Sequence, residues 1–327
     1  GNVEMIELLL NSGANIEATA TATGLTPLLM SCMMGHYDAS RLLLDRGAHI
    51  EAKSSSKGAT PLHLVCMEGE TKIAELLLDR GAHIEALTVD GTTPLHFAAC
   101  FGAGAGIVQL LLQRGANMGA LSKKGTVLLH MVCMEGKTEL AELFLDRGAD
   151  IEVATQDGNT SLHIAASFGQ MGIVQLLLRR GANLEARSNT GNTALHNAAR
   201  HGQLEILQLL LDAGADIENR SHFGFAPLDL ACLHGLVEVA QLLLDRGARV
   251  ETKPNGEMTP LCHAASRGNT EVVWLLVRRY PWLFKRRPPC DVPPPAVAPK
   301  TTRRRNGAYS ALTNVFSKIT RKTSNKK

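Results

Sequence analysis

The sequence predicts an all-α solenoid built from short stacked repeats, and three periodic signals carry this prediction. A Thr-Pro-Leu string recurs, with degenerate copies between the clear ones, at residues 26–28, 60–62, 93–95 and 259–261. A Gly-Ala pair runs in phase with this string, and an apolar triplet, usually Leu-Leu-Leu, lies between the two markers. The period is 33 or 34 residues. A fixed period of this length indicates one array of repeats and not two globular domains.

Each period predicts two helices, as the repeat that begins at Thr193 illustrates. Thr193 can cap the first helix, and in four repeats Pro follows this Thr, where its missing N–H costs nothing. After a link at Gly202, Leu residues three and four positions apart form the buried stripe of the second helix. Gly214 can adopt the positive φ needed at the end of that helix. One such unit is too small to bury its own apolar face, so its stability must come from stacking.

These units resemble the ankyrin repeat. The best matches to its signature are Thr-Pro-Leu-His-Phe-Ala at 93–98 and Thr-Ser-Leu-His-Ile-Ala at 160–165, and the resemblance extends over about residues 1–284. It implies two antiparallel helices and a projecting β-hairpin in each repeat, stacked into a curved solenoid. We expect a partial repeat at 1–18, eight repeats at 19–284, a Pro-rich linker at 285–299, and a basic tail at 300–327.

Both ends of the array depart from the pattern. Residues 1–10 match residues 202–211, so the chain opens inside a repeat, and we expect at least one more repeat upstream in the native protein. In the last repeat, Arg278, Arg279 and Tyr280 replace the Gly-Ala turn. This replacement is typical of a terminal capping repeat with a polar outer face.

The composition excludes several classes of protein. The chain is 45% hydrophobic and 20% charged, which is typical of a soluble folded protein. No apolar run reaches the roughly 18 residues of a membrane-spanning helix, and no signal peptide is visible. The seven Cys are dispersed, which argues against a disulfide framework and for a reducing compartment. We therefore expect a cytoplasmic or nuclear protein.

No residue pattern indicates catalysis, so we expect no enzyme, no metal and no cofactor. The pairs His63–Cys66 and His130–Cys133 each offer two zinc ligands, but they lie two repeats apart, whereas a structural zinc needs four converging ligands. Both Cys residues replace the second small residue of an Ala-Ala pair, which favours a packing role. Five His residues share the signature position, where the resemblance implies hydrogen bonds between neighbouring repeats: His63, His96, His130, His163 and His196.

A column of Glu residues follows the Gly-Ala pairs and is interrupted only at Gly119: Glu17, Glu51, Glu85, Glu152, Glu185, Glu218 and Glu251. Stacked like charges repel one another. We therefore expect each carboxylate to bond local backbone N–H groups or a nearby Arg or Lys. The alternative is an acidic edge that attracts a basic partner.

A solenoid without a catalytic constellation is expected to be a non-enzymatic protein-interaction scaffold or adaptor. The alternative is the binding arm of a larger enzyme, receptor or channel whose functional module lies upstream of residue 1. The partner is a protein of unknown identity, and we expect the solenoid itself to be monomeric.

The resemblance implies that the residues ending each first helix face the concave side. We expect a partner to bind along this row: Met33, Met34, Met67, Glu68, Phe101, Met134, Glu135, Phe168, Arg200, His201, Leu233, His234 and Arg267. Met and aromatic residues are enriched in interfaces, which favours Phe101 and Phe168 as contacts. The alternative is that both rings fold back against the adjacent repeat. A second set lies at the hairpin tips: Lys57, Asp90, Lys123, Lys124, Asp157, His222 and Phe223.

The last 43 residues have a different charge from the rest of the chain. They carry 12 Lys or Arg and one acid, a net charge of +11, whereas the preceding residues sum to −8. The basic runs are Lys285, Arg286, Arg287, Lys300, Arg303, Arg304 and Arg305. They are interpreted as a nuclear-import signal, as a patch for nucleic acid or anionic membrane, or as a solvated tail. Beyond them, Leu312, Val315, Phe316 and Ile319 have the spacing of a short amphipathic helix.

Overall fold

The computed structural model describes residues 1–21, 23–101, 104–120, 127–250 and 258–284. These residues form an all-helical fold, as predicted, with no strand among them. The helices fall into two compact units, residues 1–156 (unit 1) and residues 157–327 (unit 2). Each unit is described below by itself.

Unit 1 begins with α1 and continues, in its described part, as four helix pairs. The bounds are α1 (Val3–Asn11), α2 (Pro27–Met33), α3 (Tyr37–Asp45), α4 (Pro61–Glu68), α5 (Thr71–Asp79), α6 (Pro94–Cys100), α7 (Ala105–Gln113), α8 (Leu128–Glu135) and α9 (Thr138–Asp146). The first helix of each pair follows the Thr-Pro-Leu position, and the second helix carries the apolar triplet.

Unit 2 repeats the same scheme over its described residues. The bounds are α10 (Ser161–Phe168), α11 (Met171–Arg179), α12 (Ala194–His201), α13 (Leu204–Asp212), α14 (Pro227–His234), α15 (Val237–Asp245), α16 (Pro260–Arg267) and α17 (Thr270–Arg279), followed by the 3₁₀ helix η1 (Pro281–Phe284). In α17, Arg278 and Arg279 end the helix, but Trp274 and Trp282 are exposed beside them. The outer face of this last repeat is therefore not wholly polar.

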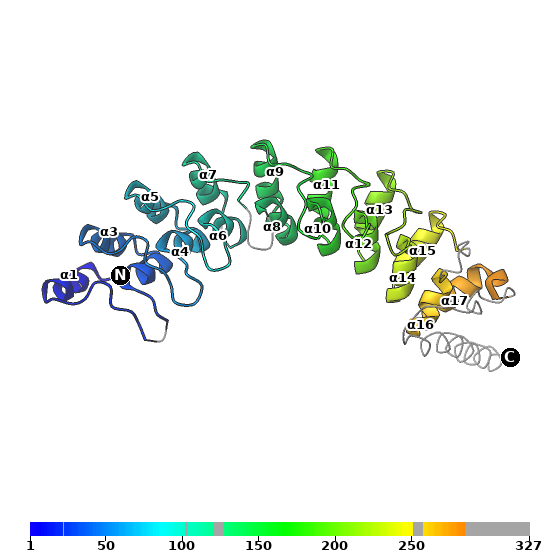
Figure 1. The fold of residues 1–327 in the computed structure, drawn as a ribbon, viewed down its shortest axis with the longest axis horizontal. Coiled ribbons are helices and arrows are strands. Elements are labelled where there is room, and N and C mark those ends of the chain that lie inside the picture. The colour runs from blue at the N-terminus through cyan, green and yellow to red at the C-terminus, as the bar shows by residue number, and fades with distance from the viewer. Residues whose placement is uncertain (22, 102–103, 121–126, 251–257, 285–327) are drawn as a thin grey trace, which may run out of the picture. The chain divides into compact units, whose positions relative to one another are not determined.

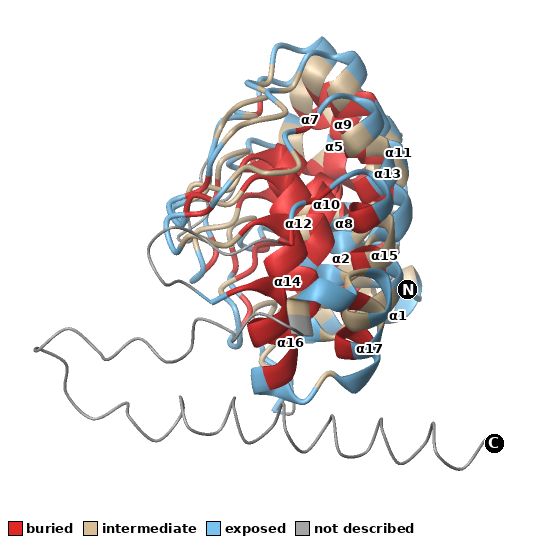
Figure 2. Cartoon of the chain, turned by 90° about the vertical axis from the view of Figure 1, so that its right-hand side faces the viewer, coloured by how far each residue is buried: buried red, intermediate tan, exposed pale blue. Residues whose placement is uncertain are grey.

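Helices of the same kind stack on one another within each unit. In unit 1, α2 packs on α4, α4 on α6 and α6 on α8, while α3, α5 and α7 form a second layer (Figure 1). The first helices are the more buried layer, as Figure 2 shows for α10, α12 and α14. Ala198 and Ala199 are fully buried there, because only small side chains let neighbouring helices approach so closely. Cys66 and Cys232 fill the position of Ala199 in their own repeats and are buried equally.

The helix ends follow the chemistry that the sequence predicts. Thr193 precedes α12 with an extended backbone, which is the N-cap conformation. Gly202 closes α12 at φ +75°, and Gly214 follows α13 at φ +95°. A side chain at Gly202 would also approach Leu236 to 3.3 Å. Gly is therefore favoured at this link chiefly for its left-handed backbone.

The predicted hairpins are present as tight turns, and no strand occurs in the part of the chain that the structure describes. The Thr88 N–H donates to the Thr92 carbonyl at 3.1 Å, and the Gly91 N–H donates to the Thr88 carbonyl at 3.0 Å. The Val89 N–H reaches the Lys57 carbonyl of the preceding turn at 3.0 Å. A strand needs a longer ladder of such bonds, so these short arms remain turns.

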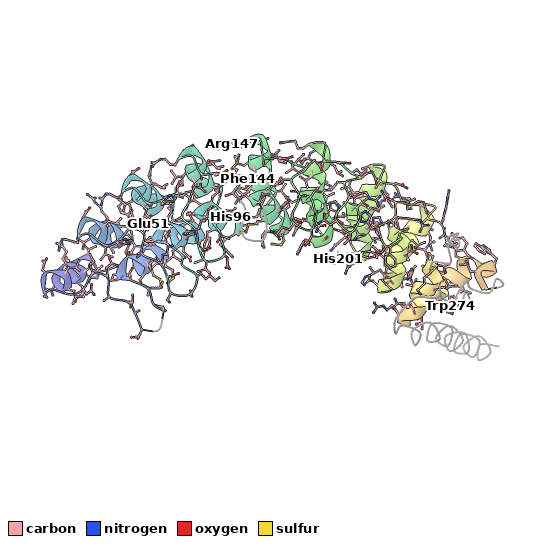
Figure 3. The ribbon with its side chains drawn as sticks, in the orientation of Figure 1. Glu51, His96, Phe144, Arg147, His201 and Trp274 are labelled. Carbon is pink, nitrogen blue, oxygen red and sulfur yellow. The ribbon has the colours of Figure 1, made fainter. Side chains whose placement is uncertain are left out.

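The Glu column joins neighbouring repeats. The Glu51 carboxylate (Figure 3) accepts the backbone N–H of His83, 32 positions ahead, at 2.8 Å. Four other members make the corresponding bond at 2.7–2.8 Å: Glu17, Glu85, Glu185 and Glu218. The predicted bonding to backbone N–H groups is confirmed for these five residues, but the N–H belongs to the next repeat and not to the same turn. Glu251 lies outside the described residues.

Second helices are joined by a ladder of ion pairs that the sequence analysis missed. The Arg at the end of one second helix bonds the Asp that ends the preceding one, each at 2.8 Å, in the pairs Arg80–Asp45, Arg114–Asp79 and Arg246–Asp212. These side chains are partly exposed, so each pair contributes at most about 1 kcal/mol. Gln113 stands at the Asp position of α7 and interrupts the ladder in front of Arg147.

The junction between the α6–α7 pair and the α8–α9 pair lacks several of these features. Gly119 replaces the column Glu, Gln113 replaces the ladder Asp, and Val127 replaces the capping Thr. A cavity of about 620 Å³ lies there, lined among others by Gly119, Phe144 and Arg147, of which Figure 3 labels the last two. Among the described residues, this junction therefore lacks the column bond and the ladder pair that Glu85 and Asp79 make between α4–α5 and α6–α7.

We expect Gly119→Glu to raise the free energy of unfolding by about 1 kcal/mol. The new carboxylate reaches the backbone N–H of Asp150, just as Glu185 bonds that of Asp216 at 2.8 Å. The backbone of Gly119 is not left-handed, and a Cβ there meets only the Asn117 side chain, at 3.3 Å. Urea unfolding followed by circular dichroism measures the change.

Gly119→Ala is the matched control, because it restricts the unfolded chain without supplying a carboxylate. Its free energy of unfolding should rise less than that of Gly119→Glu. Equal gains in the two variants would show that the carboxylate makes no inter-repeat bond at this junction.

Candidate protein-interaction surface

The first helices are fixed by the His residues at the signature position. In α12, the buried His196 Nδ1 accepts the Thr193 N–H at 3.1 Å and lies 2.9 Å from the Thr193 hydroxyl. Its Nε2–H donates to the Phe225 carbonyl of the next repeat at 2.9 Å. His63 and His163 bond the carbonyls of Thr92 and Asn192 in the same way. The predicted hydrogen bonds between neighbouring repeats are confirmed for these residues.

His130 makes only half of this arrangement. Its Nε2–H donates to the Val153 carbonyl at 2.8 Å. Its Nδ1 is buried and has no partner among the described residues, and Val127 lacks the hydroxyl that a Thr supplies beside the other signature His residues. This unpaired nitrogen is a further weakness at the start of α8.

Burial sets the protonation of the His and Cys side chains. It lowers the pKa of His63 to about 4 and also lowers the pKa of His130 and His196. It raises the pKa of Cys32 and Cys100 to about 11. The imidazoles are therefore neutral and the thiols protonated at pH 7, which suits packing and hydrogen bonding. No cluster of three or more His, Cys, Asp or Glu capable of holding a metal ion occurs among the described residues.

The residues of the expected binding row lie at the last turn of each first helix. The second residue of each pair is exposed in all eight repeats: Met34, Glu68, Phe101, Glu135, Phe168, His201, His234 and Arg267. The first residue is often half-buried. Met33 and Met67 pack against the buried Leu29 and Leu64, so they belong in part to the core of unit 1. Each unit thus presents its own row of outward side chains.

Phe101 and Phe168 are the most exposed aromatic residues of these rows. Phe101 is 62% exposed and Phe168 is 55% exposed. The Phe101 ring meets Phe97, one turn earlier in the same helix, edge-on at 5.8 Å, and Phe97 meets His63 of the preceding repeat at 5.0 Å. Phe101 is thus oriented by its own helix and keeps most of its surface in solvent.

Polar side chains from the following repeat cap the helix ends that carry the rows, a feature the sequence analysis missed. The Lys137 ammonium donates to the Ala99 and Cys100 carbonyls at 2.9 and 2.6 Å. The Asn269 amide donates to the Cys232 and Leu233 carbonyls at 2.9 and 3.0 Å. Carbonyls at a helix end lack partners inside the helix, so these bonds hold the last turn in place. The signal for them is a polar residue after the link Gly.

The two rows differ in charge. The row of unit 1 carries Glu68 and Glu135 beside its Met residues and Phe101. The row of unit 2 carries Arg200, His201, His234 and Arg267 after Phe168, and His201 is labelled in Figure 3.

The hairpin tips are also at the surface where they are described. Lys57, Asp90, Asp157 and His222 are exposed, and Phe223 is 71% exposed. Lys123 and Lys124 lie outside the described residues, as do the basic runs at 285–287 and 300–305 and the expected tail helix. The predictions for these segments stay predictions.

Comparison with protein families agrees with this geometry. The family described as "Ankyrin repeats (3 copies)" matches residues 51–122, 99–188, 129–221, 172–254 and 219–281. The related family "Ankyrin repeats (many copies)" matches residues 1–44. A search of curated proteins found no match. In the described part of the chain, none of the helices has the length and apolar character needed to cross a bilayer.

Proposed function

The chain belongs to the ankyrin-repeat family, whose repeats generally bind other proteins, and from this premise we propose that it is a non-enzymatic scaffold or adaptor. It holds a protein partner on the rows at the first-helix ends and on the neighbouring hairpin tips. The single observation that carries this proposal is the exposure of Phe101 and Phe168 on helix ends held by hydrogen bonds. Large rigid aromatic side chains lose little entropy on binding and are enriched among interface hot spots.

The proposal includes an intracellular setting and a monomeric solenoid. None of the described Cys residues forms a disulfide, and most are buried, which suits the reducing environment of cytoplasm or nucleus. Contacts with nucleic acid or anionic membrane are assigned to the basic tail alone, since the residues before it sum to −8.

We expect Phe101→Ala combined with Phe168→Ala to weaken partner binding at least about 30-fold. The partner is first captured with the full chain and identified, and its Kd is then measured by calorimetry. Because both rings are mainly in solvent, the thermal midpoint should stay within about 1 °C of the unmodified chain.

Leu8→Ala is the matched control, since Leu8 is 62% exposed on α1, away from the first-helix ends. It should leave the Kd unchanged. If the double Phe variant binds as tightly as the Leu8 variant, the rows do not hold the partner. If the double variant instead loses several degrees of thermal stability, the rings belong to the core.

A further inference from the structure

The C-terminal ends of three consecutive first helices in unit 2 gather four basic or titratable side chains. Arg200 and His201 end α12, His234 ends α14, and Arg267 ends α16. All four are exposed. Helix α14 packs against both α12 and α16, so the three ends lie next to one another.

The packing of α14 against α12 and α16 brings these side chains within electrostatic reach of one another. Burial lowers the pKa of His234, and the positive charges of Arg200, Arg267 and His201 lower it further. The pKa of His201 is lowered by burial and by the charge of Arg200. These four groups therefore form one cluster, whose members repel one another when protonated.

No carboxylate neutralises the cluster within the described part of the chain. The second helices packed beside it begin with Glu205, Glu238 and Glu271, and none of them pairs with a cluster member there. Among the described link residues, Asn269 is uncharged and occupied with the Cys232 and Leu233 carbonyls. Asp229 lies at the opposite end of α14, where it bonds the Ala226 N–H and faces Arg220 at 3.9 Å.

The helix dipole does not account for these cations. Positive groups at helix C-termini gain some stability. The corresponding ends of α4 and α8 carry Glu68 and Glu135 instead, so these helices form without a cation at that position. The positive charge of the cluster is therefore a local property of this surface.

We propose that Arg200, His201, His234 and Arg267 form a docking site for an acidic peptide segment of the protein partner, with an affinity that rises as the pH falls. Phe168 on the adjacent α10 and the half-buried Leu233 give this segment an apolar contact beside the cations. The inference rests on the proposed function, whose partner class it narrows. A long polyanion such as nucleic acid is disfavoured because the residues before the tail sum to −8.

The pH dependence follows from linkage. Carboxylates of a bound segment favour the charged imidazolium, so they raise the pKa of His201 and His234 above the free values. Binding then takes up protons, and the affinity increases as the pH falls from about 7.5 to about 5.5. Glu carboxylates of the peptide stay ionised over this range.

The test measures binding of a short fluorescein-labelled peptide, rich in Glu and carrying one Leu, to the full chain by fluorescence anisotropy. We expect about tenfold tighter binding at pH 5.5 than at pH 7.5. Arg200→Gln combined with Arg267→Gln should weaken binding at least about tenfold at both pH values. His201→Asn combined with His234→Asn should flatten the pH dependence to less than about twofold.

Two features of the chain distinguish peptide bound at the cluster from peptide bound elsewhere. The basic tail contains no His, so peptide bound there shows no such pH dependence over this range. Arg179→Gln is the matched control, because Arg179 is an exposed Arg at the end of the second helix α11. It should change neither the affinity nor its pH dependence. Circular dichroism confirms that each variant is folded.

Nuclear magnetic resonance of the imidazole protons supplies a site-resolved second readout. The pKa of His201 and His234 should rise when the peptide is added. The proposal is overturned if neither pKa rises, if the His variants keep the full pH dependence, or if a single-stranded DNA oligomer binds the cluster more tightly than the peptide. If the peptide fails to bind while the Phe variants still lose the partner, the proposed function stands and this inference falls.

Discussion

Replacing His196 by Ala is expected to lower the free energy of unfolding by about 3 kcal/mol. The side chain is fully buried and joins two repeats through its two ring nitrogens. Its removal leaves the Thr193 N–H and the Phe225 carbonyl without their partners and opens a cavity between α12 and the next repeat. Urea unfolding followed by circular dichroism measures the loss.

His130→Ala is the internal comparison for this prediction. His130 occupies the same position in its repeat, but its Nδ1 already lacks a partner among the described residues. The His130→Ala variant loses one hydrogen bond, to the Val153 carbonyl. The substitution of His130 should therefore destabilise the chain less than the substitution of His196. A loss as large for His130 as for His196 would show that cavity formation alone determines the effect and that the hydrogen bonds contribute little.

Lowering the pH from about 6.5 to about 4 is expected to destabilise the protein through its buried His residues. Burial holds the folded pKa of His63 at about 4, against 6.5 for a free side chain, and lowers those of His130 and His196 as well. Above pH 6.5 these imidazoles are neutral in both states, and their contribution is complete. Below it, the unfolded chain takes up protons that the folded protein cannot accept. His63 alone accounts for a loss of about 3 kcal/mol across this window.

Carboxylates also titrate at these pH values, so a variant must isolate the His contribution. His63→Gln removes one titrating group and should reduce the dependence of unfolding free energy on pH between about 6 and 4.5. Urea titrations at several pH values give this slope for both proteins. Equal slopes would mean that His63 is protonated as readily in the folded protein as in the unfolded chain.

The His residues behind these two stability predictions belong to local features that the sequence predicted. The Thr-Pro-Leu-His string gave the start of each first helix and the residue that fixes it, because capping and Pro placement depend on neighbours within one turn. The Glu column was found as a repeated residue type. Its true partner, the backbone N–H of His83 in the case of Glu51, lies 32 positions ahead and follows only from the stacking register.

Other contacts between repeats could not be predicted from residue types alone. The ion-pair ladder of Arg80 and Asp45 joins separate second helices, and Lys137 caps the carbonyl ends of α6. Both depend on side chains that come together only after two repeats have stacked. In the described residues, the arms of the expected hairpins are too short to form a strand ladder, so Thr88 to Thr92 close as a turn.

The candidate surface also has features that the sequence predicted and features that only the stacked repeats revealed. The repeat period and the family resemblance together indicated which residues end each first helix. Only the tertiary structure separated Met33 and Met67, which pack into the core, from Phe101 and Phe168, which do not.

The sequence by itself determined the family, the order of the helices and the positions that we propose for binding. These properties follow from local capping chemistry and from a fixed repeat length. The tertiary structure alone decided which of those positions reach solvent, which neighbouring charges act on one another, and which side chains bond across neighbouring repeats. Burial and electrostatic interaction depend on distances between repeats, and those distances exist only once the helices are stacked.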